Sequence, residues 1–546
     1  MEPKKKKVYE PQQPHCVCSQ SRTLLTISLL TAFLVFASAN QVLADTYYVA
    51  NPNGADDIAG TADDVNSSDS YTGTENQPWS TIGRAMPNWG GAGPVVSQGD
   101  TVYVASGDYG KITYSENQDT GRSNWITYIG TGATKPILRH LGISYTPNAY
   151  MKFDNFAIYK PVSGVPARSI EILGQNVSTN RASNIGFDNC YIEMATALPL
   201  GYPVWLRYAD DITFNNCEIV GGSKGLLASI HNTNLAFLNC HFHDQWGDSF
   251  AVFSNETIPT TGILVDSCIF EELIALQGVS GIADHMDYMQ IGGGGAMTST
   301  VDDVTIRNSI FNYAFDENWL DWVDTVLPST FAYNGMLFEQ IGNGFVFENN
   351  LIYGQSMNGG WQIPNTISNI VVRNNTFAHT SYYGWIPHID QLCSAVEHYN
   401  NIWYLGFTIT TPPDEVNQGN NIYSSYNNIG GGNSGPTMSS SSMIISKADI
   451  ASMFTDLAGN DFTLRANAAA VNSGNVTYAT SADLLGNPRD SLPDIGCYEY
   501  ISTSSDTTPP SVPQDITAEA VSENRIDISW QASSDSDSGV SLYNIY

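Results

Sequence analysis

Apolar and polar residues alternate along short segments between residues 150 and 405, and each segment ends in a similar four-residue phrase. In most copies the phrase has an apolar first position, a polar second, an Asn or Ser third, and a small or amide-bearing fourth. The fourth positions are Phe156, Cys190, Cys217, Cys240, Cys268, Ser309, Asn350, Asn375 and Asn401, spaced 23 to 41 residues apart. Alternation in segments rich in Val, Ile, Phe and Tyr predicts strands. Recurrence at this spacing predicts a solenoid in which each copy is one β coil.

Four of the eight cysteines occupy the same phrase position in consecutive coils. A disulfide framework usually joins different structural positions, so one Cys per coil predicts an inward column of free thiols. The other four cysteines, Cys16, Cys18, Cys393 and Cys497, lack the spacing of a zinc site.

The first 44 residues have the order of a secretory signal. Lys4 to Lys7 and Arg22 precede an uncharged apolar run at 24–39, and small residues follow it. We therefore expect residues 1–44 to be a signal peptide and the protein to be secreted, extracellular or at the cell surface. An uncleaved N-terminal anchor is the alternative and the sole membrane contact expected.

The chain is strongly acidic, with 54 Asp and Glu against 22 Lys and Arg and a formal net charge of −32. Such a charge repels nucleic acid and anionic membranes, so no nucleic-acid partner is expected. Between Leu226 and Met443 the sequence has two basic residues, Arg307 and Arg373. Many carboxylates also offer oxygen ligands, which makes calcium the candidate cofactor. We expect a monomer.

The two ends of the solenoid carry more specific phrases. Tyr47-Tyr48-Val49, Gln77-Pro78-Trp79 and Gly99-Asp100-Thr101 open it, and residues 493–500 (PDIGCYEY) close it. Over residues 45–500 the chain resembles secreted right-handed parallel β-helix proteins of the pectin-lyase-like superfamily. Residues 501–511 look like a linker, and residues 512–546 resemble the first strands of a fibronectin type III module, too few to close its sandwich. The expected fold is all-β: a right-handed parallel β-helix followed by a partial fibronectin type III module.

A second strand follows the phrase in each coil and suggests a sugar-binding stripe. If its apolar residues point inward, alternation places polar and aromatic residues outward. Aromatic faces stack on sugar rings and amides bond hydroxyls, so these residues are candidate substrate contacts. An ordinary solvated face is the alternative. The candidates are Trp205, Tyr288, Gln290 and Gln362, with Trp319 and Trp322 added from a long coil that predicts a protruding loop.

Asp248 and Asp287 each stand just before such a strand in neighbouring coils. Stacking would bring their carboxylates about 5 Å apart, an arrangement suited to acid/base chemistry or to a cation. Asp284 and His285 lie beside them and are further catalytic candidates; turn-forming acids and a hydrogen-bonded His are the alternative. Candidate calcium ligands are Asp56, Asp57, Asp63, Asp64 and Asp244.

The resemblance implies an enzyme that acts on an extracellular polysaccharide, foremost a lyase, in which Lys224 or Arg207 would supply the cation or base. A glycoside hydrolase on a neutral glycan, using two of the acids, is one alternative. A non-catalytic, adhesive glycan-binding protein is another, because one fold serves all three functions.

Overall fold

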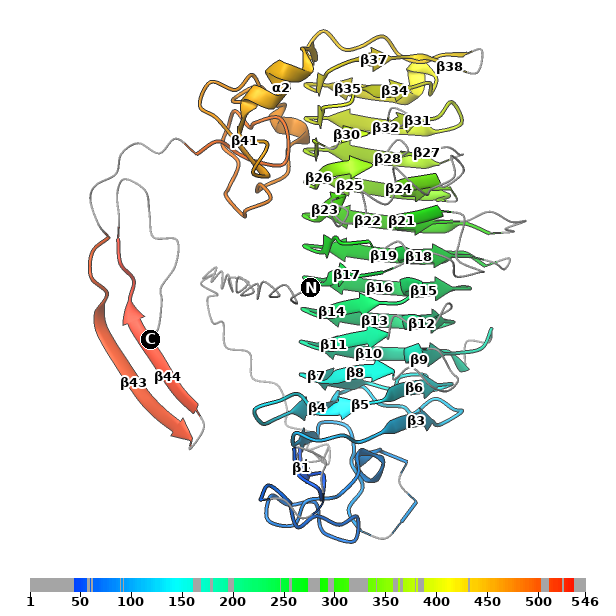
Figure 1. Cartoon of the computed structure of the whole chain (residues 1–546), viewed down its shortest axis with the longest axis vertical. Coiled ribbons are helices and arrows are strands. Elements are labelled where there is room, and N and C mark those ends of the chain that lie inside the picture. The colour runs from blue at the N-terminus through cyan, green and yellow to red at the C-terminus, as the bar shows by residue number, and fades with distance from the viewer. Residues whose placement is uncertain are drawn as a thin grey trace, which may run out of the picture. The chain divides into compact units, whose positions relative to one another are not determined.

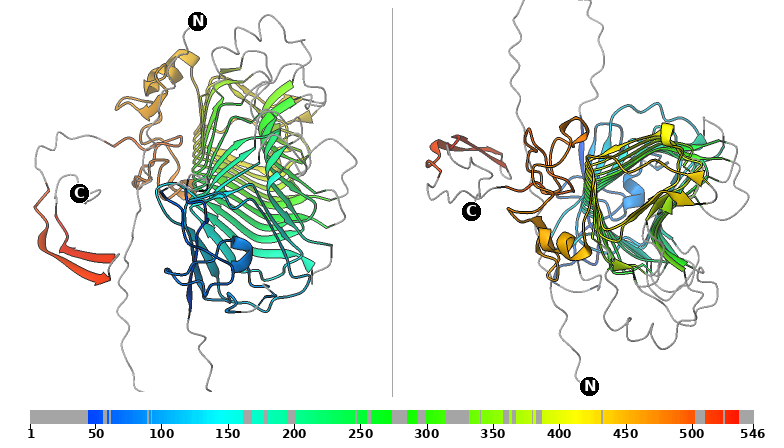
Figure 2. Two further views of the ribbon diagram at one scale, coloured as in Figure 1. Left: turned by 60° about the horizontal axis from the view of Figure 1, so that its bottom comes forward. Right: turned by 90° about the horizontal axis from the view of Figure 1, so that it is seen from above.

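The computed structural model describes residues 44–501 and 510–534, with internal gaps at 56–58, 60–61, 89, 92, 161–167, 177–179, 195–200, 246, 255–257, 274–284, 293–298, 314–331, 340, 357–361, 364–366, 379, 382–386, 431–432 and 523–524. Three long parallel sheets, named here sheets 1, 2 and 3, run side by side along the solenoid axis (Figure 1). Viewed from above, they wrap around one interior (Figure 2). Each coil contributes one strand to each sheet in turn, which is the topology of a parallel β-helix.

Sheet 1 contains the strands that lead into the four-residue phrase. Its order is β1 (Thr46–Val49), β2 (Thr101–Val104), β4 (Ile126–Gly130), β7 (Met151–Asp154), β10 (Ala182–Asp188), β13 (Ala209–Asn215), β16 (Thr233–Leu238), β19 (Thr260–Asp266), β22 (Val301–Arg307), β25 (Asn343–Glu348), β28 (Ser368–Arg373), β32 (Ser394–Tyr399) and β35 (Val416–Gly419).

Sheet 2 contains the strands that follow the phrase. Its order is β5 (Ile137–Leu138), β8 (Ala157–Lys160), β11 (Tyr191–Met194), β14 (Glu218–Gly221), β17 (His241–His243), β20 (Ile269–Phe270), β23 (Ile310–Tyr313), β26 (Leu351–Ser356), β29 (Thr376–Phe377), β33 (Ile402–Trp403), β36 (Ile422–Tyr423) and β40 (Met443–Ile444), and β30 (Thr380–Ser381) also pairs with β26.

Sheet 3 contains the third strand of each coil. Its order is β3 (Lys111–Ser115), β6 (His140–Ser144), β9 (Arg168–Leu173), β12 (Tyr202–Arg207), β15 (Lys224–Ser229), β18 (Asp248–Phe253), β21 (His285–Ile291), β24 (Ala332–Phe338), β27 (Gln362–Ile363), β31 (His388–Ile389), β34 (Phe407–Ile409) and β37 (Tyr426–Asn427).

Short elements complete the described chain. They are η1 (Ile82–Ala85), η3 (Pro413–Glu415), α2 (Lys447–Met453), η4 (Val476–Tyr478) and the strand pairs β38 (Ile429–Gly430) with β39 (Asn433–Ser434), β41 (Phe454–Asp456) with β42 (Asp461–Leu464), and β43 (Gln514–Ser522) with β44 (Arg525–Gln531).

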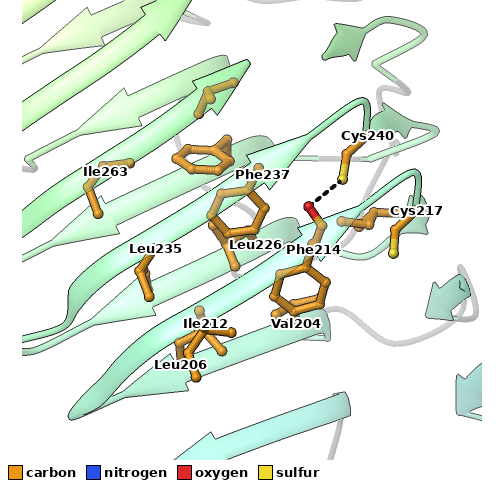
Figure 3. Packing of buried hydrophobic residues seen from close by; sticks show 14 of the residues in the cluster. Val204, Leu206, Ile212, Phe214, Cys217, Leu226, Leu235, Phe237, Cys240 and Ile263 are labelled. Atoms are coloured by element: carbon orange, nitrogen blue, oxygen red, sulfur yellow. Dashed lines mark hydrogen bonds between the residues drawn. The ribbon is translucent and has the colours of Figure 1, made fainter. Parts of the chain in front are cut away.

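Like residues stack in columns along the interior. Phe153, Phe187, Phe214 and Phe237 occupy one register position of sheet 1, and their successive ring centroids are 5.7, 4.8 and 5.3 Å apart. All four rings are fully buried. Figure 3 shows this packing around Phe214 and Phe237. One coil cannot bury such a ring alone, so the column holds neighbouring coils together.

The third residue of the phrase turns the chain from sheet 1 into sheet 2. From Asn155 to Asn400 this residue has φ between 52° and 63° in every copy. Most side chains are strained in this left-handed region, whereas Asn enters it at low cost. The corner therefore explains the recurring Asn.

The fourth residue points inward at the same corner and forms a second column. Cys190, Cys217, Cys240 and Cys268 are buried and free, which confirms the predicted thiol column. In later coils the column changes to Ser309 and then to asparagines whose Oδ1 atoms accept from the backbone N–H of the preceding coil, at 2.9 Å for Asn350 and 3.0 Å for Asn401. The thiols make weak hydrogen bonds to backbone carbonyl oxygens, as Cys240 Sγ does to Phe214 at 3.5 Å (Figure 3), whereas the asparagines form a ladder of side-chain to backbone hydrogen bonds from coil to coil.

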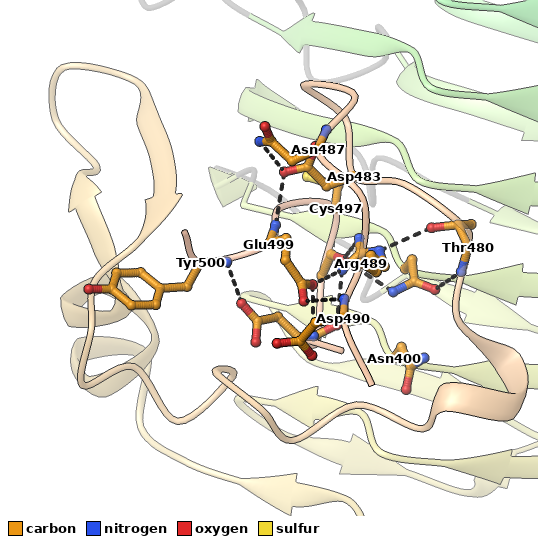
Figure 4. A network of polar contacts seen from close by, with 12 residues as sticks. Asn400, Thr480, Asp483, Asn487, Arg489, Asp490, Cys497, Glu499 and Tyr500 are labelled. Carbon is orange, nitrogen blue, oxygen red and sulfur yellow. Dashed lines mark hydrogen bonds and ion pairs between the residues drawn. The ribbon is translucent and has the colours of Figure 1, made fainter. Parts of the chain in front are cut away.

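A C-terminal cap segment, residues 454–500, packs against the outer side of the last coils. Its apolar residues share a small core with Leu351, Ile402 and Ile422 of sheet 2. Hydrogen bonds join it to the coils, among them those from the backbone N–H groups of Thr480 to Asn374 Oδ1 (3.1 Å) and of Cys497 to Thr376 Oγ1 (3.0 Å). Within the cap, Arg489 and Glu499 form a buried ion pair (Nη1 to Oε2, 2.9 Å), with side chains 2% and 4% exposed (Figure 4). The closing phrase at 493–500 lies within this cap.

The expected right-handed parallel β-helix is confirmed. Residues 1–43, which contain most of the expected signal peptide, and residues 502–509 of the expected linker lie outside the described residues. β43 and β44 form an antiparallel hairpin, consistent with a start of the expected module but not a sandwich. No helix among the described residues is long and apolar enough to cross a membrane.

Candidate functional site

The starting residues of successive sheet 3 strands form a polar column, named here the corner column. Tyr202 pairs in register with Arg168, and Lys224 pairs with Asp248. The register of the next pair of strands, in which Phe250 faces Met289, places Asp287 beside Asp248. The backbone register thus places the two acids side by side, while the predicted approach of their carboxylates stays a prediction. Arg168, Tyr202 and Lys224 precede them along the column.

The centre of this column is an ion pair between the Lys224 ammonium and the Asp248 carboxylate. The other Asp248 oxygen, Oδ1, accepts from the backbone N–H of Asp287 at 3.2 Å. Asp248 and Asp287 are fully buried, whereas the Lys224 side chain is 20% exposed. Of these three side chains, Lys224 alone has surface exposed to solvent.

Trp205 lies on the outer face of sheet 3 beside this column. The Arg168 guanidinium sits 3.5 Å from the centre of the indole ring and forms an ion pair with Glu171 at 2.8 Å. The indole Nε1 donates to the Ser229 hydroxyl at 3.0 Å. One indole face is thus covered by a cation, and the ring is fixed by a hydrogen bond across two coils.

The structure does not bring Arg207 to the acids. It ends β12, five residues from Tyr202 at the corner, or roughly 17 Å along the strand. Its guanidinium lies 5.3 Å from the Tyr208 ring centre. Of the two predicted cations, Lys224 alone contacts Asp248.

The expected exposed stripe is wrong in the central coils. Tyr288 is 1% exposed and belongs to the core, and burial raises its pKa. A bulge between β21 and β24, on either side of Asp287, breaks the alternation assumed from sequence. Gln290 keeps the outward position but is 4% exposed, because this part of the outer face is covered: its register neighbours Ala251 and Leu337 are buried too.

Several predicted residues lie outside what the structure describes, namely Asp56, Asp57, Asp284, Trp319 and Trp322. For His285 and Gln362 the backbone places the residues in β21 and β27, and their side chains are outside the described part. Asp63 and Asp64 lie in an exposed turn, where Asp63 Oδ2 accepts from the backbone N–H of Ala55 at 2.6 Å.

The remaining metal candidate, Asp244, belongs to a cluster on the outer side of sheet 2. Its Oδ2 lies 3.0 Å from Nδ1 of His243, and the opposite ring nitrogen, Nε2, lies 3.1 Å from Oε1 of Glu218. His241, two residues earlier on the same strand face, pairs with Glu271 at 2.9 Å. Although burial alone would lower the pKa of His243, bonds to the two carboxylates raise it to about 9.

Sequence reasoning missed Glu218 and Glu272 as members of this cluster. Glu272 follows β20 in the next coil, and its carboxylate lies within 4.8 Å of the donor atoms of His243 and Asp244. Burial and repulsion from Glu271 and Asp244 raise the pKa of Glu272. The alternating His-Phe-His at 241–243 was the available signal, because it places two imidazoles on one strand face.

A family model and two solved structures show what this chain is similar to. The family model for the right handed beta helix region matches residues 137–273. Pectate lyase Pel9A has 16% identity over 84% of this chain and 96% of its own, with a TM-score of 0.45. The GH136 lacto-N-biosidase from Eubacterium ramulus has 10% identity over 73% of this chain and 68% of its own, with a TM-score of 0.39. Curated proteins give no match.

Proposed function

We propose that this protein is secreted and acts on an extracellular polysaccharide that carries uronate groups, at the corner column of sheet 3. The observation that carries the proposal is the order of residues along the corner column: Arg168, Tyr202 of the next coil, Lys224, then the buried acids Asp248 and Asp287. In a chain of net charge −32, this grouping of cations beside an indole is a place where a polyanion can bind.

Among enzymatic reactions, β-elimination fits this corner better than hydrolysis. A hydrolase needs two carboxyl groups that reach the glycosidic bond from either side. Asp248 and Asp287 are both fully buried, so they support the cation rather than touch a sugar. Lys224 would instead neutralise the uronate carboxylate, which acidifies the adjacent C–H. His285 of β21, of which the backbone is described, is the candidate base for that proton; the electron pair forms the double bond as the glycosidic oxygen leaves and takes a proton from water. A calcium ion that neutralises the substrate would have to bind elsewhere, because the Asp248 and Asp287 carboxylates are buried.

Non-catalytic glycan binding is the second candidate, and one observation favours it. The Lys224 ammonium donates to a buried carboxylate. A proton-abstracting base must offer a lone pair, which an ammonium in such a pair does not. In this case the column would bind a polyanion without cleaving it.

The test is an assay of the full chain on pectate, alginate, glycosaminoglycans and neutral glycans, with calcium or with a chelator. A lyase releases products with the ultraviolet absorbance of unsaturated uronates, a hydrolase releases reducing ends without it, and a binding protein retains the glycan unchanged. Lys224→Met should abolish activity on, or binding to, the uronate polymer. Lys111→Met is the matched control, because Lys111 is an exposed lysine that begins β3 of the same sheet.

Lys224→Met alone leaves a buried Asp248 carboxylate without its cation, which can destabilise the fold. The double variant Lys224→Met with Asp248→Asn removes both charges and separates the two effects. A folded double variant without function supports the proposal. A folded double variant with full function, or wild-type protein that neither cleaves nor binds any uronate polymer, contradicts it.

A further inference from the structure

The cluster on the outer side of sheet 2 is independent of the corner column and has no role in the proposed function. His243 ends β17, Asp244 follows it, and Glu272 follows β20 in the next coil. One ring nitrogen of His243 and one carboxylate oxygen from each acid lie within 4.8 Å of one another. The backbone fixes the two coils at this point, because the N–H of Asp244 donates to the carbonyl oxygen of Glu272 at 3.0 Å.

His243 is already oriented for such a site. Its Nε2 is held by Glu218 at 3.1 Å, so Nδ1 faces Asp244 at 3.0 Å. The side chain is 14% exposed, which limits its alternative orientations. A carboxylate on the far ring nitrogen is the usual outer contact of a metal-binding histidine, since it fixes the ring and makes the near nitrogen a stronger donor.

The charge of the cluster calls for a cation. Four carboxylates, those of Glu218, Asp244, Glu271 and Glu272, converge from three coils. In the described part of the chain, Glu218, Asp244 and Glu271 form ion pairs with histidines. With both imidazoles protonated the six groups carry a net charge of −2, and a divalent ion that replaces the His243 proton lowers this to −1.

We propose that His243, Asp244 and Glu272 form a divalent transition-metal site, with Glu218 as the outer contact that orients His243. One imidazole and two carboxylates suit Zn²⁺ or Mn²⁺, whereas Ca²⁺ takes six to eight oxygen ligands and gains nothing from the imidazole. Three protein ligands leave coordination positions open to water or to an anionic group of a bound molecule.

The test is isothermal titration of the tag-free, chelator-treated full chain with ZnCl₂, MnCl₂ and CaCl₂, and with Co²⁺ as a spectroscopic probe. We expect one Zn²⁺ per chain and an absorption spectrum of bound Co²⁺ that reports nitrogen ligation. His243→Ala and Glu272→Gln should each weaken Zn²⁺ binding about 100-fold, and Glu218→Gln about 10-fold, as an outer contact does. His241→Gln is the matched control and should change the affinity less than threefold.

Glu218, Glu272 and His241 are exposed or partly exposed and His243 is 14% exposed, so an unchanged urea midpoint of the metal-free protein is the check that all four variants fold. The proposal would be overturned if Zn²⁺ binding survived His243→Ala or were weakened equally by His241→Gln. It would also be overturned if the protein preferred Ca²⁺ to Zn²⁺ or bound no metal at all. The glycan assays do not enter this test, so the two proposals can fail separately.

Discussion

The asparagine column makes a sharp prediction about the stability of the last coils. Asn401 is fully buried and connects three coils. Its Oδ1 accepts from the backbone N–H of Asn375 at 3.0 Å, and its Nδ2 donates to the carbonyl oxygen of Val372 at 2.8 Å. Asn401→Ala leaves the Asn375 N–H without its acceptor and the Val372 carbonyl without its donor, in a fully buried part of the core.

The expected loss can be worked out from these contacts. A buried polar group left without its partner costs about 1–3 kcal/mol. The Asn375 N–H and the Val372 carbonyl each lose theirs, so Asn401→Ala should cost about 2–6 kcal/mol. Asn401→Ser should cost about half as much, because Ser309 in the same column accepts from the backbone N–H of Cys268 at 3.1 Å. Cys217→Ala is the matched control: it removes one small, weakly bonding sulfur, at a cost of about 1 kcal/mol.

Urea unfolding of the three variants compares their losses of stability, and hydrogen exchange shows which coils lose protection. The amide of Asn375 should exchange faster in Asn401→Ala, because its acceptor is gone, while amides in the first coils should keep their protection. If Asn401→Ala were no more destabilising than Cys217→Ala, or if the Asn375 amide kept its wild-type exchange rate, the ladder would not be the source of stability inferred here.

Three further outcomes follow from buried charged groups. Burial lowers the pKa of His398 from 6.5 to about 3, so unfolded chains take up a proton that the fold excludes; stability should fall below pH 6.5, by about 2 kcal/mol at pH 5, and His398→Gln should remove this slope in urea midpoints. Burial raises the pKa of Asp494 from 3.8 to about 6, so the stability of the cap should fall by about 2–3 kcal/mol as pH rises from 4 to 7. Asp494→Asn should make hydrogen-exchange protection of the cap nearly independent of pH over this range. Arg489→Met leaves Glu499 buried without its cation and should cost about 3–5 kcal/mol, seen as cap-specific proteolysis that Arg489→Met with Glu499→Gln partly reverses.

The sequence by itself determined the coil and its columns. The recurring phrase gives one corner per coil, and since strands in adjacent coils pair side by side, equivalent phrase positions must stack. This is why the cysteine column and the alignment of Asp248 with Asp287 could be predicted. The cysteine column needs the repeat alone, whereas the alignment of the two acids also needed the position at which the following strand starts.

Only the tertiary structure decided which side chains contact one another and which reach solvent. The coils differ in length from 23 to 41 residues, so residue counting does not give the register between Lys224 and Asp248 or the approach of Glu272 to His243. A single bulge put Tyr288 into the core, against simple alternation. Strand periodicity is a local property of the chain, whereas burial and ion pairing depend on what neighbouring coils place alongside, and that is set by packing in three dimensions.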